Sequence, residues 1–325
     1  MIEVHNLTKR YGKHCAIDRL SFTVETGEVF GLLGPNGAGK TTTVHVLCTL
    51  LRATSGNAFI DGSDVEQQRA KVCRLFGVVF QEPCLDERLT AWENLALQAA
   101  LYGLSHSVTR PRIDALLDLV ELREWARAPV RNFSGGMKRR LEIARGLIHH
   151  PRLLFLDEPT LGLDPHSFNR IWEYIQNLRQ SEGITVFLTT NNMAEAEQAN
   201  RVAILDRGRL IALDTPEGLK CQIGGDTVTL NTADNALASR LIEARWGYRT
   251  YPSESGLQFK VPLSNELIPA LIEHLGLPVY SISSHNATLN DVFLALTGHE
   301  LHDEQPDSRE RMQRWWKHRQ WSGRY

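Results

Sequence analysis

The feature that most constrains the fold of this chain is a glycine-rich segment, Gly34–Thr41, placed between two regular elements. The continuous apolar run Val29–Leu33 precedes it, as in a strand buried on both faces, and a helical pattern from Lys40 to about Leu51 follows it. The segment fits the pattern G-x-x-x-x-G-K-[ST], in which backbone N–H groups and a helix N-terminus bind phosphate oxygens. The strand, loop and helix together predict a nucleotide-binding α/β domain rather than a plain turn before a helix.

Two side chains at the end of this segment carry the chemistry of such a loop. Lys40 would reach the β- and γ-phosphates, and the Thr41 hydroxyl would ligate Mg²⁺. ATP with Mg²⁺ is therefore the expected cofactor. The residues expected to hold the nucleotide in this segment are Gly34, Pro35, Asn36, Gly37, Ala38, Gly39, Lys40, Thr41 and Thr42.

Apolar runs and helical patterns alternate through the following part of the chain. That alternation predicts a parallel sheet with crossover helices. Asp206-Arg207-Gly208, between two apolar runs, is typical of a hairpin turn near the end of the domain. The expected helices are 113–122, 137–149, 167–181 and 193–199, and the expected strands are 153–157, 184–188 and 202–205.

A second motif is the apolar run 153–156, which ends in the carboxylates Asp157 and Glu158. The carboxyl ends of parallel strands form the edge at which α/β proteins bind ligands. Asp157 suits Mg²⁺, directly or through water, and Glu158 is placed to polarise an attacking water. Two solvated acids at a strand end are the alternative, and the upstream phosphate loop argues against it.

A third motif, Ser134-Gly135-Gly136, opens a basic helix ahead of the acidic strand. A capping serine and two glycines expose helix N–H groups that can hold a γ-phosphate, although the same string also serves as a simple N-cap. With these three motifs in this order, the chain resembles the ATP-binding cassette (ABC) family. The resemblance covers about residues 1–220 and implies a P-loop NTPase cassette, with a RecA-like core and antiparallel β and helical subdomains.

Three further residues take their expected roles from the resemblance. Tyr11 matches an aromatic residue that faces adenine, and Gln81 matches a glutamine that senses Mg²⁺ and the attacking water. Asp164 ends a Leu-Gly-Leu-Asp segment that matches a loop crossing the dimer interface. Each has an ordinary alternative: aromatic packing for Tyr11, a strand-end polar residue for Gln81 and a helix cap for Asp164.

Within the family the chain is most similar to daunorubicin-resistance-type ATPase subunits of two-component exporters. The supporting segments are 79–83, 85–90, 133–137 and 287–294. Met137 replaces the more general glutamine of the signature, an exchange that leaves the Ser134-Gly135-Gly136 donors in place.

One position departs from the family pattern. Where the family has a switch histidine, the chain reads Thr189-Thr190-Asn191, so that an amide stands in place of an imidazole. An amide can donate a hydrogen bond to a phosphate, but it cannot carry the imidazolium charge. We therefore expect Asn191 to retain ATP binding and to slow hydrolysis, unless Asn192 or another group compensates.

The region after residue 220 changes pattern. Its elements follow the order β-α-β-β-α-β, which predicts a small ferredoxin-like α+β domain at about 221–300. The tail, 301–325, interleaves arginines with Trp315, Trp316 and Trp321. Such a tail suits either a membrane interface or a flexible end, and we favour the flexible end.

Composition limits the partners of the chain. The 36 basic and 38 acidic side chains give a net charge of −2, so no basic field suggests nucleic acid as the main partner. Five scattered cysteines without C-x-x-C spacing and no signal-peptide pattern suit a reducing cytoplasm. No apolar run approaches the roughly 20 residues of a spanning helix, so any permease must be a separate chain.

These observations predict the ATP-hydrolysing subunit of a membrane exporter on the cytoplasmic face of the membrane. Two copies would sandwich ATP head to tail, with the Lys40 loop of one copy facing Ser134 of the other. The region from Gln81 through the apolar helix Trp92–Tyr102 is the expected permease-docking surface, unless that helix packs on its own domain. The alternative function is that of a non-transport ABC ATPase acting on ribosomes or nucleic acid, although the 93 residues between Lys40 and Ser134 contain no sustained heptads.

Overall fold

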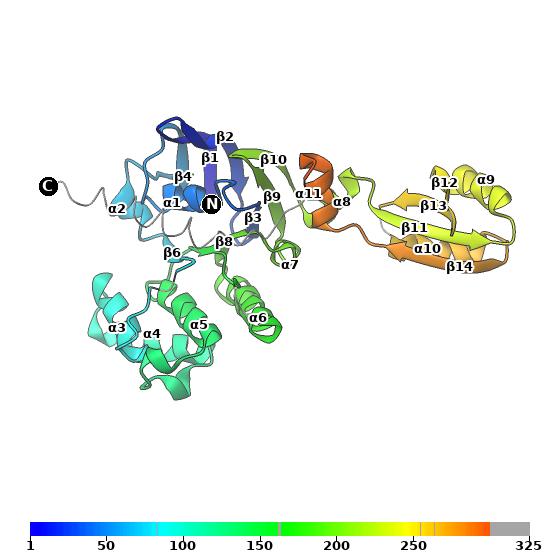
Figure 1. Ribbon diagram of the computed structural model, residues 1–325. Helices are drawn as coiled ribbons and strands as arrows, with labels where there is room; N and C mark the ends of the chain where they lie inside the picture. The colour runs from blue at the N-terminus through cyan, green and yellow to red at the C-terminus, as the bar shows by residue number, and fades with distance from the viewer. Residues whose placement is uncertain (83, 162–163, 254, 263, 300–325) are drawn as a thin grey trace, which may run out of the picture.

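The computed structural model describes residues 1–82, 84–161, 164–253, 255–262 and 264–299. Its centre is a six-stranded sheet of order β10-β9-β3-β8-β7-β6 (Figure 1). All neighbouring strands pair in parallel except β10, which forms the predicted hairpin with β9 through Arg207 and Gly208. The strands are β3 (Val29–Leu33), β6 (Phe76–Val79), β7 (Leu153–Asp157), β8 (Thr185–Thr190), β9 (Arg201–Asp206) and β10 (Arg209–Asp214).

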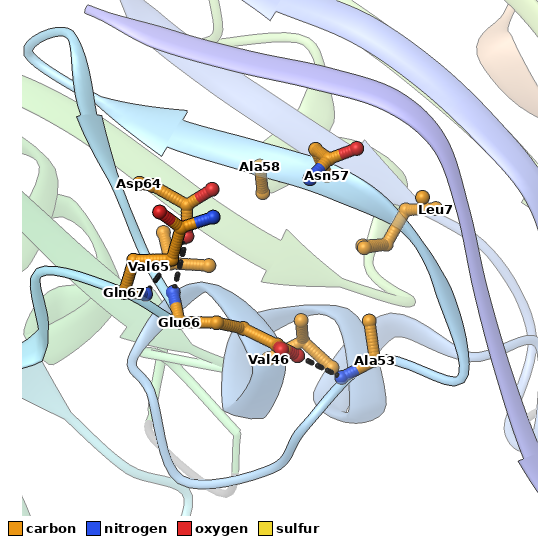
Figure 2. Close-up of a pocket in the computed structure, with 10 residues that line it drawn as sticks. Leu7, Val46, Ala53, Asn57, Ala58, Asp64, Val65, Glu66 and Gln67 are labelled. Carbon is orange, nitrogen blue, oxygen red and sulfur yellow. Dashed lines mark hydrogen bonds between the residues drawn. The ribbon is translucent and has the colours of Figure 1, made fainter.

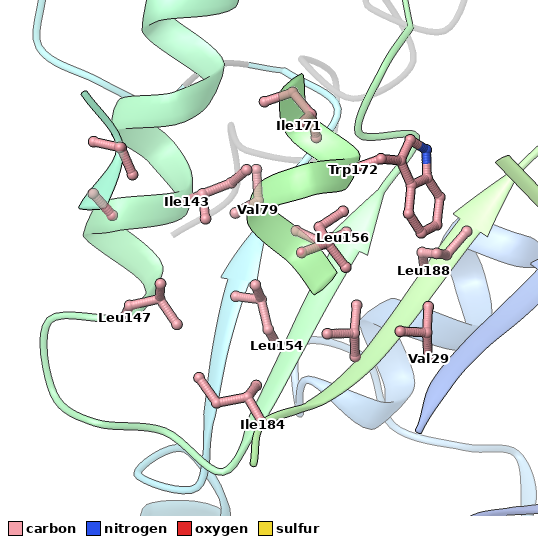
Figure 3. Close-up of a cluster of buried hydrophobic side chains, with 14 of the residues drawn as sticks. Val29, Val79, Ile143, Leu147, Leu154, Leu156, Ile171, Trp172, Ile184 and Leu188 are labelled. Carbon is pink, nitrogen blue, oxygen red and sulfur yellow. The ribbon is translucent and has the colours of Figure 1, made fainter. Parts of the chain in front are cut away.

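Both faces of this sheet are buried, which is why its strands read as continuous apolar runs. Successive side chains point to opposite faces, so Leu154 and Leu156 enter one core while Leu153 and Phe155 enter the other. Figure 3 shows the first core, in which Trp172 lies beside Leu188 and Leu156. In the second core a row of phenylalanines runs across four neighbouring strands of the sheet and comprises Phe30, Phe187, Phe155 and Phe76, and Phe22 from outside this sheet stacks on Phe30; successive ring centroids are 5.3–5.5 Å apart.

A four-stranded antiparallel sheet of order β2-β1-β4-β5, together with helix α1 (Lys40–Leu47) and the short α2 (Arg69–Val72), covers the second core. Its strands are β1 (Ile2–Tyr11), β2 (His14–Val24), β4 (Ser55–Ile60) and β5 (Ser63–Asp64). The first two are longer than their alternating stretches predict, because register shifts and the left-handed residues Asn6 and Arg19 interrupt the alternation. A small pocket of about 70 Å³ lies between this sheet and the end of α1, lined by Val46, Asn57 and Glu66 among others (Figure 2).

The opposite face carries the helical region and two further helices. The helical region comprises α3 (Ala91–Leu101), α4 (His106–Leu119), the 3₁₀ turns η1 (Arg123–Trp125) and η2 (Val130–Asn132), and α5 (Gly135–Gly146). Helices α6 (Pro165–Glu182) and α7 (Met193–Ala196) complete this face. The predicted helix 113–122 was wrong in its bounds, because α4 begins at His106 and continues through Pro111. The burial of Ile113, Leu116 and Leu117 against the core outweighs the helix-breaking effect of the proline.

The chain continues through α8 (Pro216–Gln222) into a small separate sheet of order β12-β13-β11-β14. Its elements are β11 (Asp226–Thr232), α9 (Asn235–Trp246), β12 (Thr250–Ser253), β13 (Gly256–Val261), α10 (Ser264–His274) and β14 (Val279–His285). All pairs are antiparallel and the helices cover one face through a core of their own. This is the predicted ferredoxin-like order, and the predicted fold class is confirmed.

The last described helix, α11 (Leu289–Thr297), does not pack with the small sheet. Leu289, Val292 and Phe293 are fully buried in the first core of the cassette, and the helix contacts α8 and α7 (Figure 1). The range 221–300 therefore groups α11 with a unit whose core it does not share, because only tertiary packing reveals this return of the chain. The tail 301–325 lies outside the described residues. None of the helices in the described ranges has both the length and the hydropathy that crossing a bilayer requires.

Candidate active site

The glycine-rich loop joins β3 to α1 at the carboxyl edge of the central sheet, as predicted. Gly39 has φ +107°, and a Cβ there would lie 2.5 Å from the Ala16 carbonyl oxygen, so no other residue fits. The Gly34 N–H donates to the Thr190 carbonyl oxygen at 3.2 Å, which ties the loop to the end of β8. The loop therefore presents the N-terminus of α1 at the same edge as the ends of β7 and β8.

Lys40 is the first residue of α1 and is 5% exposed. Its ammonium donates to the carbonyl oxygens of Gly34 at 2.8 Å and Pro35 at 3.2 Å, and it lies 3.5 Å from Glu158 Oε1. Burial lowers the pKa of Lys40, while the Glu158 and Asp157 carboxylates partly oppose that shift. The cation of the loop and the acid of β7 thus face one another across the candidate site.

Asp157 ends β7 and is 1% exposed. Its Oδ1 accepts a hydrogen bond from Thr41 Oγ1 at 3.3 Å and another from the Thr189 hydroxyl. A carboxylate and a hydroxyl at this spacing form a hard oxygen donor set, which fits Mg²⁺ held jointly with nucleotide phosphates. The two motifs predicted to bind the metal are therefore brought together from positions 116 residues apart.

Glu158 has a backbone conformation that few non-glycine residues adopt. Its φ is +48°, in the left-handed region, which costs of the order of 1–3 kcal/mol. Its N–H donates to the Thr189 carbonyl oxygen at 3.0 Å, and its side chain is 8% exposed. Strain of this kind persists only where the surroundings hold the residue in place.

Asn191 follows β8 directly, next to the phosphate loop that Thr190 contacts. The neighbouring Asn192 is the N-cap of α7, and its Oδ1 accepts a hydrogen bond from the Ala194 N–H at 2.9 Å. Capping thus uses the Asn192 side-chain oxygen, while donation to a phosphate would use the amide nitrogen.

The signature residues lie on the helical region. Ser134 is the N-cap of α5 and accepts a hydrogen bond from the Met137 N–H at 3.2 Å, and Gly135 and Gly136 form the first turn. Asp164 is the N-cap of α6, and its carboxylate accepts from Ser167 Oγ at 2.7 Å. This hydrogen bond holds the pKa of Asp164 below its ordinary value. Asp164 thus acts as a helix cap, which is the alternative role that the sequence offered for it. Gly162 and Leu163 of its loop lie outside the described residues.

The two remaining predicted residues lie at the surface. Gln81 is exposed just beyond β6, one strand away from Asp157 in the sheet. Tyr11 ends β1 with 47% exposure, and the Lys9 ammonium lies 5.2 Å from its ring centroid. On β2, the strand after Tyr11, it is Ala16 that lies against the phosphate loop. The adenine role of Tyr11 stays a prediction.

Two buried charged residues beside the site were not predicted from the sequence. Arg139 appeared only as part of a basic helix, yet it is 7% exposed and bonds the end of β7. Glu195 on α7 is 1% exposed, and its Oε1 accepts from the Thr160 N–H at 3.1 Å. Burial raises the pKa of its carboxyl. No pattern in the sequence separates these two from ordinary solvent-facing charges on a helix.

Comparison with known proteins agrees with this geometry. Residues 17–161 match the family model described as ABC transporter. The chain is 40% identical to the daunorubicin/doxorubicin resistance ATP-binding protein DrrA of Streptomyces peucetius, over 93% of this chain and 94% of the relative. It is 39% identical to the Nod factor export ATP-binding protein I of Ralstonia nicotianae, over 93% and 95%.

Among solved structures, a dimeric post-hydrolysis state of the ATP-binding cassette MJ0796 bound to ADP and Pi matches with a TM-score of 0.60. The match has 27% identity and covers 66% of this chain and 98% of that one. The strand–loop–helix, the acidic strand end and these likenesses converge on one assignment: the chain belongs to the ABC transporter family, as one of its ATP-binding, ATP-hydrolysing subunits.

Proposed function

We propose that this chain powers a separate membrane permease, as an export subunit on the cytoplasmic face of the membrane. The observation that carries the proposal is the junction of the two nucleotide motifs, in which Thr41 lies 3.3 Å from Asp157 and Lys40 lies 3.5 Å from Glu158. Relatives named for drug resistance and for export match over almost the whole chain, which supports the coupling to export.

Each site residue has a defined role in this proposal. The glycine-rich loop and Lys40 bind the phosphates, and Tyr11 faces the adenine. Thr41, Asp157 and Gln81 hold Mg²⁺, which neutralises charge on the phosphates when bound. Glu158 polarises the attacking water, and Asn191 donates a hydrogen bond toward the γ-phosphate.

Two copies complete the site. Ser134, Gly135 and Gly136 start α5 on the helical region, and the contacts described above for the phosphate loop within one chain are to β2, β8, β9 and the end of β7. We place the signature of one copy against the loop of the other, with Asp164 at the interface between them. A solved relative that forms a dimer supports this arrangement.

The permease is expected at the exposed side of α3. Leu97 is 52% exposed and Leu101 is 74% exposed, whereas Leu95 is fully buried in the core. The helix is thus amphipathic and packs on its own domain, but it leaves two large apolar side chains for a partner. Two adjacent exposed leucines on one helix are a suitable anchor for an apolar segment of a membrane protein.

The alternative function, action on ribosomes or nucleic acid, finds no support in these relatives, whose names refer to resistance and export. Co-purification with an integral membrane protein supports the exporter. Sedimentation of the chain with ribosomes supports the alternative.

Mixing of two variants tests the head-to-tail site. Lys40→Ala destroys the loop of each copy and Ser134→Arg blocks each signature, so either variant by itself has no intact site. A mixed dimer has both defects in one site and leaves the other site intact. We expect ATP turnover by the mixture at a substantial fraction of the natural rate, and turnover close to zero for each variant separately. A mixture as inactive as its components would overturn the proposal.

A further inference from the structure

The buried guanidinium of Arg139 lies beside the candidate active site and bonds the backbone of the residues that end β7. Arg139 is the fifth residue of α5 and is 7% exposed. A guanidinium carries five N–H donors in a rigid plane, and here it makes five hydrogen bonds. Such complete use of a buried arginine indicates that its position is fixed from several sides.

Three of these bonds hold the end of β7. Nη2 donates to the carbonyl oxygens of Asp157 at 3.0 Å and Glu158 at 3.1 Å, and Nε donates to that of Pro159 at 2.8 Å. Glu158 is the residue with φ +48°, and its N–H is held on the other side by Thr189. Arg139 and Thr189 therefore hydrogen-bond the two peptide groups on either side of the Glu158 Cα and hold its strained conformation.

The remaining two bonds are made by Nη1. It donates to the carbonyl oxygen of Phe80, the residue before Gln81, at 2.6 Å, and to Glu142 Oε2 on the same helix at 3.1 Å. The other oxygen of Glu142 accepts from the Cys84 N–H at 2.8 Å, and Arg145 Nη1 donates to the Cys84 carbonyl oxygen at 2.7 Å. Helix α5 thus holds the backbone on both sides of Gln81, and its Arg139 side chain bonds both Phe80 and Glu158.

We propose that Arg139 is a positioning residue for ATP hydrolysis: it sets Glu158 and Gln81 relative to one another and to the signature helix that Ser134 begins. The inference rests on the proposed roles of Glu158 and Gln81. A cation on α5 bonded to both backbones makes the orientation of α5 and the orientation of the acid mutually dependent. Lysine cannot replace the planar guanidinium of Arg139, because an ammonium has only three donors and no fixed plane.

Turnover and nucleotide affinity separate this role from simple stabilisation. We expect Arg139→Gln and Arg139→Lys to lower ATP turnover about 10- to 100-fold, because a small misplacement of a catalytic group is that costly. The Kd for ATP, measured by titration calorimetry, should stay within about threefold, since the phosphate loop is untouched. The matched control is Arg140→Gln, one residue along the same helix, whose Nη1 donates to the Val120 carbonyl oxygen within the helical region.

The outcomes are distinct. Full turnover in either Arg139 variant, an equal loss of turnover and ATP binding, or an equal loss of turnover in the Arg140 control overturns the inference. If the Arg139 variants do not fold, Glu142→Gln tests the inference instead. Glutamine keeps the shape of the Glu142 side chain but removes the negative charge that pairs with Arg139. We then expect turnover about 3- to 10-fold lower with unchanged ATP binding, and unchanged turnover would overturn the inference. Glu158→Gln measured alongside tests the proposed function itself, since retained turnover there would remove the catalytic role of Glu158.

Discussion

At the scale of single residues, Asn191 departs from the family pattern, and the effect of this departure on ATP turnover can be measured. It stands at the end of β8 beside the phosphate loop, where an imidazolium would give a charge-assisted hydrogen bond. We expect Asn191→His to raise ATP turnover about fivefold or more, which corresponds to about 1 kcal/mol in the barrier. A steady-state phosphate-release assay measures the change.

Asn192→Ser is the matched control for this substitution. Serine keeps a side-chain oxygen that can cap α7, removes the amide donor and leaves the net charge unchanged. Turnover should be unchanged. A loss of turnover in Asn192→Ser together with no gain in Asn191→His would show that Asn192 compensates for the missing histidine.

The buried carboxyl of Glu195 makes the stability of the folded protein depend on pH. Burial raises the pKa of its carboxyl above the ordinary 4.5, so the folded protein favours the protonated form. The resulting stabilisation is complete below the unfolded pKa and is lost as the pH rises through the folded pKa. Glu195→Gln stays neutral, and its melting temperature should fall less between about pH 5 and about pH 8 than that of the natural chain. The exposed Glu173, changed to Gln, should leave the natural pH dependence intact; parallel curves for all three proteins would refute this account.

At the scale of elements, α11 belongs energetically to the cassette. Phe293 is fully buried in the first core of the cassette, whereas its neighbour Leu294 is 40% exposed. We expect Phe293→Ala to lower the free energy of unfolding of the cassette by about 3–5 kcal/mol, because it leaves a cavity. Leu294→Ala should cost less than about 1 kcal/mol. Urea unfolding measures both, and similar small losses would mean that α11 contributes little to the cassette.

At the scale of the whole molecule, the proposed docking surface is the exposed side of α3. The double variant Leu97→Asp and Leu101→Asp should weaken association with the permease more than about tenfold, while ATP binding by the isolated chain is unchanged. Co-purification of the two chains measures the association. The matched control places aspartate at Leu237 and Ile272 of the small unit, which are 41% and 58% exposed. If only this control pair loses the permease, the contact surface lies on the small unit instead.

Much of the cassette could be predicted because its signals are local. The strand–loop–helix at Gly34–Thr41, the acidic end of β7 and the caps Ser134 and Asp164 each depend on neighbouring residues. Boundaries failed where packing overrides local preference, as at Pro111 inside α4. The expected range 221–300 includes α11, whose buried residues lie in the first core of the cassette, because a sequence range does not show which core a segment joins.

Consecutive residues alone supply the chemical groups and the order in which they follow one another, since a phosphate loop is a property of neighbouring positions in the chain. Which of these groups meet depends on how the chain packs. Thr41 and Asp157 are 116 residues apart in the chain and share a hydrogen bond, because parallel strands end at one edge of the sheet. The burial of Arg139 and Glu195 is likewise decided by packing, since a charge on a helix has the same sequence signal whether it faces solvent or the site.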